Sequence, residues 1–232
     1  MRDQYNEQLK DLDGRLSQMG SLCEECISRV ALALAGQEQG SAPEETEKLL
    51  RRVYQSDAAI DRMEREIEAL CYKLLLKQQP VASDLRFVSA ALKMISDMER
   101  IGDQCADIAD ITRFLTDEKA FSLESSVHIR DMATGTMHMV TRAVDSFVRR
   151  DLSQAREVIA SDDDVDGLFD EVRTEIAGLI ARYPERGMVL LDLLMIAKYF
   201  ERLGDHATNV AEWVEFAVTG EHSKKNKYEN QD

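Results

Sequence analysis

The sequence is poor in residues that break helices, because its 232 residues include only 3 prolines and 11 glycines. It also contains no run of alternating β-branched residues of the kind that forms a strand. Leucine, alanine, methionine, glutamate and arginine, which favour helices, are abundant instead. These features argue against a β-rich domain and predict an all-α protein.

Long hydrophobic runs are also absent. No apolar stretch approaches the ~20 residues of a membrane-spanning helix, and the strongest, Met188 to Ala197, is interrupted by Asp192. The N-terminus does not have the pattern of a signal peptide. A net charge of -15 disfavours direct binding to nucleic acid or to anionic lipid. We therefore expect a soluble, cytoplasmic protein with no nucleic-acid partner and no membrane insertion.

Cysteine is scarce, with four residues in the chain. Without an export signal these are expected to be reduced thiols. Cys23 and Cys26 form a C-x-x-C, a spacing that elsewhere indicates zinc or redox chemistry, but the chain has no second C-x-x-C. Both also occupy apolar positions of a heptad pattern that runs from Leu9 to Ala33. We interpret them as small residues of a helical core.

The apolar periodicity predicts six long antiparallel helices. Their expected ranges are about 5–35, 44–76, 83–115, 123–149, 152–182 and 185–218. Gly36 and Gly220 are expected to end the first and last helices, while Pro80 and Pro184 mark turns. The resulting division is a first unit at 1–116, a second at 117–222 and a polar tail at 223–232.

The two units repeat one another. Residues 56–61 match 161–166 at an offset of 105, and residues 99–110 match 201–212 at an offset of 102. The three-residue difference falls at the prolyl turn, where loop length varies most easily. Each unit contains three helices, so the repeat predicts two tandem three-helix bundles.

The pentapeptide Glu-Arg-x-Gly-Asp occurs at 99–103 and again at 201–205. Each copy places two carboxylates four residues apart on one helix face, where like charges repel by roughly 0.2–0.5 kcal/mol. An acidic pair lies about forty residues upstream of each copy. The first acidic set is Asp57, Asp61, Glu99 and Asp103, and the second acidic set is Asp162, Asp166, Glu201 and Asp205.

The positions of these carboxylates are symmetric about the predicted turns. In the first set the pairs share a midpoint at residue 80, and in the second they share one at 183.5. Two helical hairpins would therefore bring each acidic pair level with its partner, roughly 28 Å below the turn. Gly102 and Gly204 lie between the carboxylates, and a glycine inside a helix, which costs about 1 kcal/mol, suggests close packing.

Four carboxylates on neighbouring helices form an oxygen-rich ligand set. Such ligands suit magnesium, calcium, manganese or iron better than a structural zinc site. We therefore predict a metal site at each acidic set, with iron, manganese, magnesium or zinc as its ion. Asp107 extends the same stripe, Asn209 is its counterpart in the repeat, and His206 is a further candidate at the rim.

The doubled pentapeptide, the acidic pairs and the stretch from Gln78 to Arg86 together resemble the PhoU family, accessory regulators of bacterial phosphate uptake and signalling. The resemblance covers nearly the whole chain and implies that the acidic motifs hold metal ions on the bundle surface. It also implies a non-catalytic, cytoplasmic and dimeric protein. The second repeat lacks the stretch after Gln78 at its own turn, 183–186, so the two sets are expected to differ in occupancy or metal.

The resemblance further implies partners and a role. The partners are the phosphate ABC transporter, through its ATPase subunit, and a sensor histidine kinase, which recruit the protein to the inner face of the membrane. The implied role is negative regulation: the protein restrains phosphate uptake and phosphate-starvation gene expression when phosphate is plentiful.

Two other classes of protein remain open. The first is a metal-dependent helical-bundle enzyme of the di-iron oxidase type, although such sites usually add Glu-x-x-His, which is absent from this sequence. The second is a metal-free acidic helical scaffold that binds basic partners. A scaffold would lose its partner gradually as salt is added, whereas loss of the ligands would empty a metal site.

Overall fold

The computed structural model describes residues 2–38, 42–78, 83–115 and 126–221. These ranges form six α-helices and one 3₁₀ turn, which confirms the all-α prediction. The elements are α1 (Arg2–Glu38), α2 (Pro43–Gln78), α3 (Ser83–Leu115), α4 (Ser126–Arg149), α5 (Leu152–Arg182), η1 (Pro184–Arg186) and α6 (Gly187–Thr219). Among the helices described, none combines the length and the apolar character that a bilayer span requires.

The helix ends follow the predicted ranges with two corrections. The prediction that the first helix ends at Gly36 is wrong, because α1 continues to Glu38 without the left-handed conformation that a C-terminal glycine supplies. The sixth helix begins at Gly187, later than predicted, because Pro184–Arg186 forms the 3₁₀ turn. Gly220 does end α6, with φ of 84° and its N–H donating to the carbonyl of Phe216.

Several predicted features lie outside the described residues. They are the turn at Pro80, the start of the fourth helix near Leu123, the boundary between 116 and 117, and the tail at 223–232.

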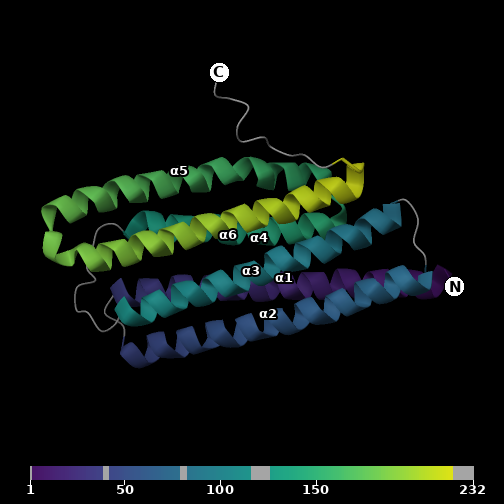
Figure 1. Cartoon of the computed structure of the whole chain (residues 1–232), viewed down its shortest axis with the longest axis horizontal. Helices are drawn as coiled ribbons and strands as arrows, with labels where there is room; N and C mark the ends of the chain where they lie inside the picture. Colours follow the sequence, from purple (N-terminus) through teal and green to yellow (C-terminus); the bar gives the residue numbers. More distant parts are fainter. Residues whose placement is uncertain (1, 39–41, 79–82, 116–125, 222–232) are drawn as a thin grey trace, which may run out of the picture.

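The six helices form two three-helix bundles that lie side by side along their length (Figure 1). In the first bundle α2 packs against α1 and α3, and in the second α5 packs against α4 and α6. The bundles meet through α3 against α6 and α1 against α4. As a result α2 and α5 lie at opposite edges of the molecule (Figure 1), and each acid-bearing hairpin, α2–α3 or α5–α6, has one edge helix and one central helix.

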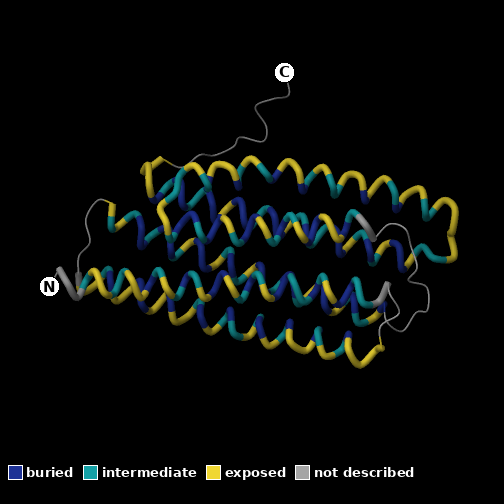
Figure 2. Tube along the Cα trace, turned by 180° about the vertical axis from the view of Figure 1, so that it is seen from behind, coloured by how far each residue is buried: buried dark blue, intermediate teal, exposed yellow. Residues whose placement is uncertain are grey.

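One apolar core runs through both bundles, and the buried side of each helix faces inward (Figure 2). Ile67 of α2, Met94 of α3 and Phe200 of α6 are among its largest fully buried side chains. The Phe87 ring of α3 stacks on Phe147 of α4 with centroids 4.3 Å apart, which joins the bundles directly. The two repeats therefore share one core, and each bundle covers part of the apolar surface of the other.

The C-x-x-C of α1 lies in this core. Cys23 and Cys26 are fully buried, and both are free thiols. The Cys23 thiol donates to the Met98 carbonyl at 3.5 Å, and the Cys26 thiol donates to the Val53 carbonyl at 3.6 Å. Burial raises the pKa of Cys23, which keeps it neutral. The two residues thus pack as predicted, and their hydrogen bonds link α1 to α3 and to α2.

Candidate metal centre

The first acidic set lies along the contact between α2 and α3. A Cβ atom placed on Gly102 would stand 2.8 Å from Asp57 Oδ1 and 3.2 Å from Ile60 Cδ1, closer than side chains normally pack. The missing side chain of Gly102 therefore leaves the space that the Asp57 carboxylate occupies. This contact agrees with the levels predicted from the sequence, which put Asp57 beside Asp103.

Asp57 carries the clearest electrostatic signature of the set. Its Oδ1 atom is buried and makes no hydrogen bond within the described residues. Burial, together with the negative charges of Asp61, Asp103 and Asp107, raises its pKa to about 6. Burial and the Asp103 charge likewise raise the pKa of Glu99. The first acidic set thus contains carboxylates that lie close enough to oppose each other's ionisation.

One arginine compensates part of this charge. Arg100 Nη1 lies 2.8 Å from Asp103 Oδ2, and its Nε lies 3.5 Å from Glu99 Oε2. Because Arg100 is largely exposed, these ion pairs are weakened by solvent. Asp57 makes no such pair within the described residues. The negative charge of the first acidic set is therefore only partly neutralised, and the part on α2 has no positive partner among the described residues.

The side chains of the first set are near one another without surrounding a common point. Within the described ranges, no three histidine, cysteine or acidic side chains are placed to hold an ion together. Repulsion between carboxylates favours such splayed rotamers. The fit to a cation rests instead on the unpartnered Asp57 oxygen, the gap at Gly102 and the oxygen-only donors.

In the second acidic set, α5 and α6 meet at the same level as α2 and α3 do in the first, but their side chains pack differently. Asp162 is buried, while Asp166, Glu201 and Asp205 are partly buried. A Cβ atom on Gly204 would stand 3.5 Å from Val165 Cγ1, which is ordinary van der Waals contact. Val165 and Gly204 are the counterparts of Ile60 and Gly102, so α5 and α6 meet at the equivalent level.

A lysine distinguishes the second set from the first. Lys198 Nζ lies 2.6 Å from Glu201 Oε2 and 5.2 Å from the centroid of the Phe169 ring. The counterpart of Lys198 at the offset of 102 is Ser96, so the first set has no lysine there. Sequence reasoning missed this residue, although alignment of the repeats would have revealed it. The second acidic set thus includes its own positive charge.

The remaining sequence candidates lie along the junction of α3 and α6. His206 Nδ1 lies 2.9 Å from Asp97 Oδ1, and the Asn209 amide donates to the same oxygen at 3.0 Å. Farther along, burial and the Asp107 carboxylate raise the pKa of Tyr199. In this structure His206 and Asn209 therefore lie beside Asp97, whereas Asp107 lies with the first acidic set. Asp97 itself was not predicted.

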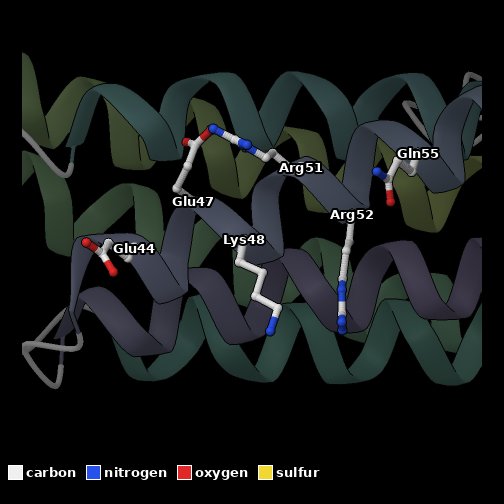
Figure 3. A pocket seen from close by; sticks show the side chains of 6 residues that line it. All are labelled: Glu44, Glu47, Lys48, Arg51, Arg52 and Gln55. Carbon is white, nitrogen blue, oxygen red and sulfur yellow. The ribbon is translucent and has the colours of Figure 1, made fainter.

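A second, mixed-charge surface of α2 lies nearer its N-terminus. Six residues line a surface hollow of about 390 Å³ there: Glu44, Glu47, Lys48, Arg51, Arg52 and Gln55. Figure 3 shows Lys48 and Arg52 extending to one side of α2, while Arg51 extends toward Glu47. Arg52 and Lys48 are five and nine residues from Asp57, which places them on the far side of the helix. The edge helix α2 therefore has acidic residues of the first set toward α3, and Lys48 and Arg52 on its far side.

The fold and the repeated acidic motif define a class: all-helical proteins built from two repeated three-helix bundles with carboxylates on their surfaces. The PhoU domain family model matches residues 16–112 and 129–214, one match in each bundle. The chain belongs to the PhoU family.

Relatives and solved structures agree with this assignment. A phosphate-specific transport system accessory protein PhoU homolog from Clostridium acetobutylicum is 33% identical over 93% of this chain and 94% of its own length. The crystal structure of PhoU from Pseudomonas aeruginosa has a TM-score of 0.85 at 31% identity, covering 94% of this chain and all of that one. A phosphate transport system regulatory protein PhoU from Streptococcus pneumoniae has a TM-score of 0.81 at 26% identity, covering 95% and 99%.

Proposed function

We propose that this protein is an accessory regulator of phosphate transport, which restrains phosphate uptake and phosphate-starvation signalling when phosphate is plentiful. The observation that carries the proposal is the match to relatives named phosphate-specific transport system accessory proteins, which extends over 93% of the chain. Both bundles take part in that match, so the whole architecture is common to the relatives and this chain.

The protein acts as a non-catalytic adaptor in the cytoplasm. Its partners are the ATPase subunit of the phosphate ABC transporter and a sensor histidine kinase, which recruit it to the inner face of the membrane, and it works as a homodimer. The edge helix α2 supports an adaptor role, because it presents the acidic residues of the first set on one side and Lys48 and Arg52 on the other.

A metal ion at the first acidic set is part of this proposal. Asp57, Asp61, Glu99 and Asp103 would hold it, with Asp107 beside them, and iron, manganese or magnesium suit their oxygen atoms best. When bound, the ion supplies positive charge that neutralises the carboxylates and can also attract acidic groups of a partner. The second acidic set is a weaker site, because Lys198 already neutralises Glu201.

The chain's own residues set the conditions for binding. The raised pKa of Asp57 means that a proton competes with a cation for this carboxylate near pH 6. Arg100 forms ion pairs with Asp103 and Glu99, but it is largely exposed, so solvent weakens its competition with a bound cation. Gly102 keeps the Asp57 oxygen close to α3. Together these residues favour a site whose occupancy falls below neutral pH.

The regulatory proposal is tested by deleting the gene and measuring alkaline phosphatase in phosphate-rich medium. We expect phosphatase to rise in the deletion strain and to return to low levels with the wild-type gene. Complementation with Asp57→Asn combined with Asp103→Asn is expected to leave it high. Low phosphatase in the deletion strain would contradict the regulatory role. Full complementation by the double variant would contradict only the role of the acidic set.

The metal-free scaffold is the second candidate, because no three possible ligands gather around one point among the described residues. A scaffold would bind its partner equally well before and after chelation, and binding would weaken gradually with salt. Our proposal predicts a loss of partner binding on chelation that manganese restores. The oxidase alternative is less well supported, since such sites use histidine and His206 is engaged with Asp97.

A further inference from the structure

A small cavity opens at the end of the molecule where α6 ends and α1 and α3 begin, at the right in Figure 1. Its volume is about 450 Å³, within the roughly 300–1,000 Å³ of small-molecule sites. Both bundles contribute to its wall, through α1 and α3 on one side and α4 and α6 on the other. The lining residues are Asn6, Leu9, Ser83, Asp84, Phe87, Phe147, Arg150, Val214, Ala217 and Val218.

Six of the ten residues that line this cavity are apolar, and polar groups contribute about as much of its surface as apolar groups do. Leu9, Val214 and Val218 provide aliphatic surface, and the stacked rings of Phe87 and Phe147 provide aromatic surface. Apolar walls with a few polar groups are the usual chemistry of sites for small organic molecules. The cavity lies at the opposite end of α6 from Lys198 and is separate from both acidic sets.

Arg150 is the cavity's cationic group, and its backbone is unusual. Among the described residues it is the single non-glycine with positive φ, at 55°. It follows the last residue of α4, where its N–H donates to the Phe147 carbonyl and the Asp151 N–H donates to the Ser146 carbonyl. Helices that end with this pair of hydrogen bonds normally have glycine at the left-handed position. Gly220 occupies the left-handed position at the end of α6.

An arginine at a position that suits glycine indicates a role for its side chain. The guanidinium of Arg150 lies 4.4 Å from the centroid of the Phe87 ring. No carboxylate among the described residues forms an ion pair with it, although its charge partly offsets the rise that burial causes in the pKa of the Asp13 carboxyl on α1. Residues held in unfavourable backbone conformations concentrate at binding sites. An unusual backbone conformation and a cationic side chain at a cavity therefore coincide at Arg150.

We propose that this cavity binds a small organic anion with an apolar body, whose acidic group pairs with Arg150 and whose body packs against Leu9, Val214 and Val218. Two carboxylates oppose an anion there: Asp84, at the start of α3, lines the cavity, and Asp13 of α1 interacts with the Arg150 charge. A ligand with a single acidic group can approach the guanidinium while its apolar part fills the cavity. Because both bundles line the cavity, the bound molecule touches both repeats.

The test uses the full-length protein and the fluorescent anion anilinonaphthalene sulfonate as the probe. Decanoate is then added to displace the probe, with decanol as the uncharged control of the same chain length. We expect saturable probe binding that decanoate reverses at concentrations at least tenfold below those of decanol. Absence of saturable binding, or equal displacement by both compounds, would overturn the proposal.

Three variants test the location. Arg150→Gly is expected to weaken probe binding at least tenfold while the thermal midpoint stays the same or rises, since glycine suits the left-handed backbone. Val218→Trp, at the exposed edge of the cavity, is expected to weaken binding similarly by filling space. Asp84→Asn is expected to strengthen binding by removing a like charge. Wild-type affinity for the probe in both Arg150→Gly and Val218→Trp would refute the site. This result does not depend on the proposed regulatory function.

Discussion

Asp57 Oδ1 lies within 2.8 Å of the position that a Cβ atom on Gly102 would occupy. The contact joins an acidic residue of α2 to the centre of the Glu-Arg-x-Gly-Asp motif of α3. It explains why a glycine occupies the interior of a long helix, despite a cost of about 1 kcal/mol relative to alanine. Substitution of Gly102 is therefore the most direct way to displace the Asp57 carboxylate of the first acidic set.

We expect Gly102→Ala to weaken cation binding roughly tenfold or more, as changes to residues that orient metal ligands do. The new methyl group would force the Asp57 carboxylate to rotate away. Stability is expected to change by no more than about 1 kcal/mol, since better helix propensity offsets the crowding. Manganese titration and denaturant unfolding measure the two effects.

Gly204→Ala is the matched control for this substitution. Its methyl group would meet Val165 and Met139 at 3.5 Å and 3.8 Å, which are ordinary contacts. We therefore expect a gain in stability of about 1 kcal/mol from helix propensity, with cation binding unchanged. Equal losses of manganese affinity in both alanine variants would show that Gly102 has no special relation to Asp57.

Asp57→Asn is expected to change how stability depends on pH. The folded-state pKa of Asp57 is about 6, above its ordinary value of 3.8. Between these values the folded protein holds a proton that the unfolded chain has lost, so this group's contribution to stability falls as pH rises through 6. Chelated wild-type protein should therefore lose stability between about pH 5 and about pH 7.5, and the variant should lose less. Denaturant unfolding at both pH values measures this, and identical losses would contradict the assignment.

Lys198→Met is expected to strengthen cation binding at the second acidic set. The lysine ammonium lies 2.6 Å from Glu201 Oε2 and competes with any cation for that carboxylate. Removing one positive charge at this distance should raise manganese affinity severalfold, the first set being unaffected. Lys93→Met, on the exposed surface of α3, is the control and should have no effect. An unaltered binding isotherm for Lys198→Met would argue that the second set is not a cation site.

Asp97→Ala is expected to destabilise the junction between the bundles by about 1–2 kcal/mol. It removes the oxygen that contacts both His206 and Asn209, whose bonds join α3 to α6. Asp164→Ala, an exposed change on α5, should alter stability by less than about 0.5 kcal/mol. Unfolding of both variants in denaturant provides the comparison. A loss no larger than that of the control would mean that the contact contributes little.

Much of the fold followed from local patterns in the sequence. The range predicted for α5 is the range observed, because Asp151 caps its start and the chain turns at Pro184. The heptad of α1 identified its buried face, including Cys23 and Cys26. The level of Asp57 against α3 followed from the midpoint rule alone, since an antiparallel hairpin fixes which residues lie opposite one another.

One feature that sequence reasoning missed depends on contact between the repeats, and others depend on local backbone conformation. Asp97 meets His206 only because α3 packs against α6, and nothing in the spacing of one hairpin indicates that neighbour. Gly36 was misread as a helix end because glycine is tolerated inside a helix when its hydrogen bonds continue. The left-handed backbone of Arg150 was likewise not predicted, because sequence preference assigns that conformation to glycine.

We propose that the first acidic set holds a metal ion. The most direct measurement is calorimetric titration of manganese into chelator-treated protein, comparing wild type with Asp57→Asn combined with Glu99→Gln. We predict saturable binding by the wild type that is lost or at least a hundredfold weaker in the double variant, with the helical circular dichroism spectrum unchanged. Equal binding by the two proteins, or no binding by the wild type to manganese or ferrous iron, would contradict the account.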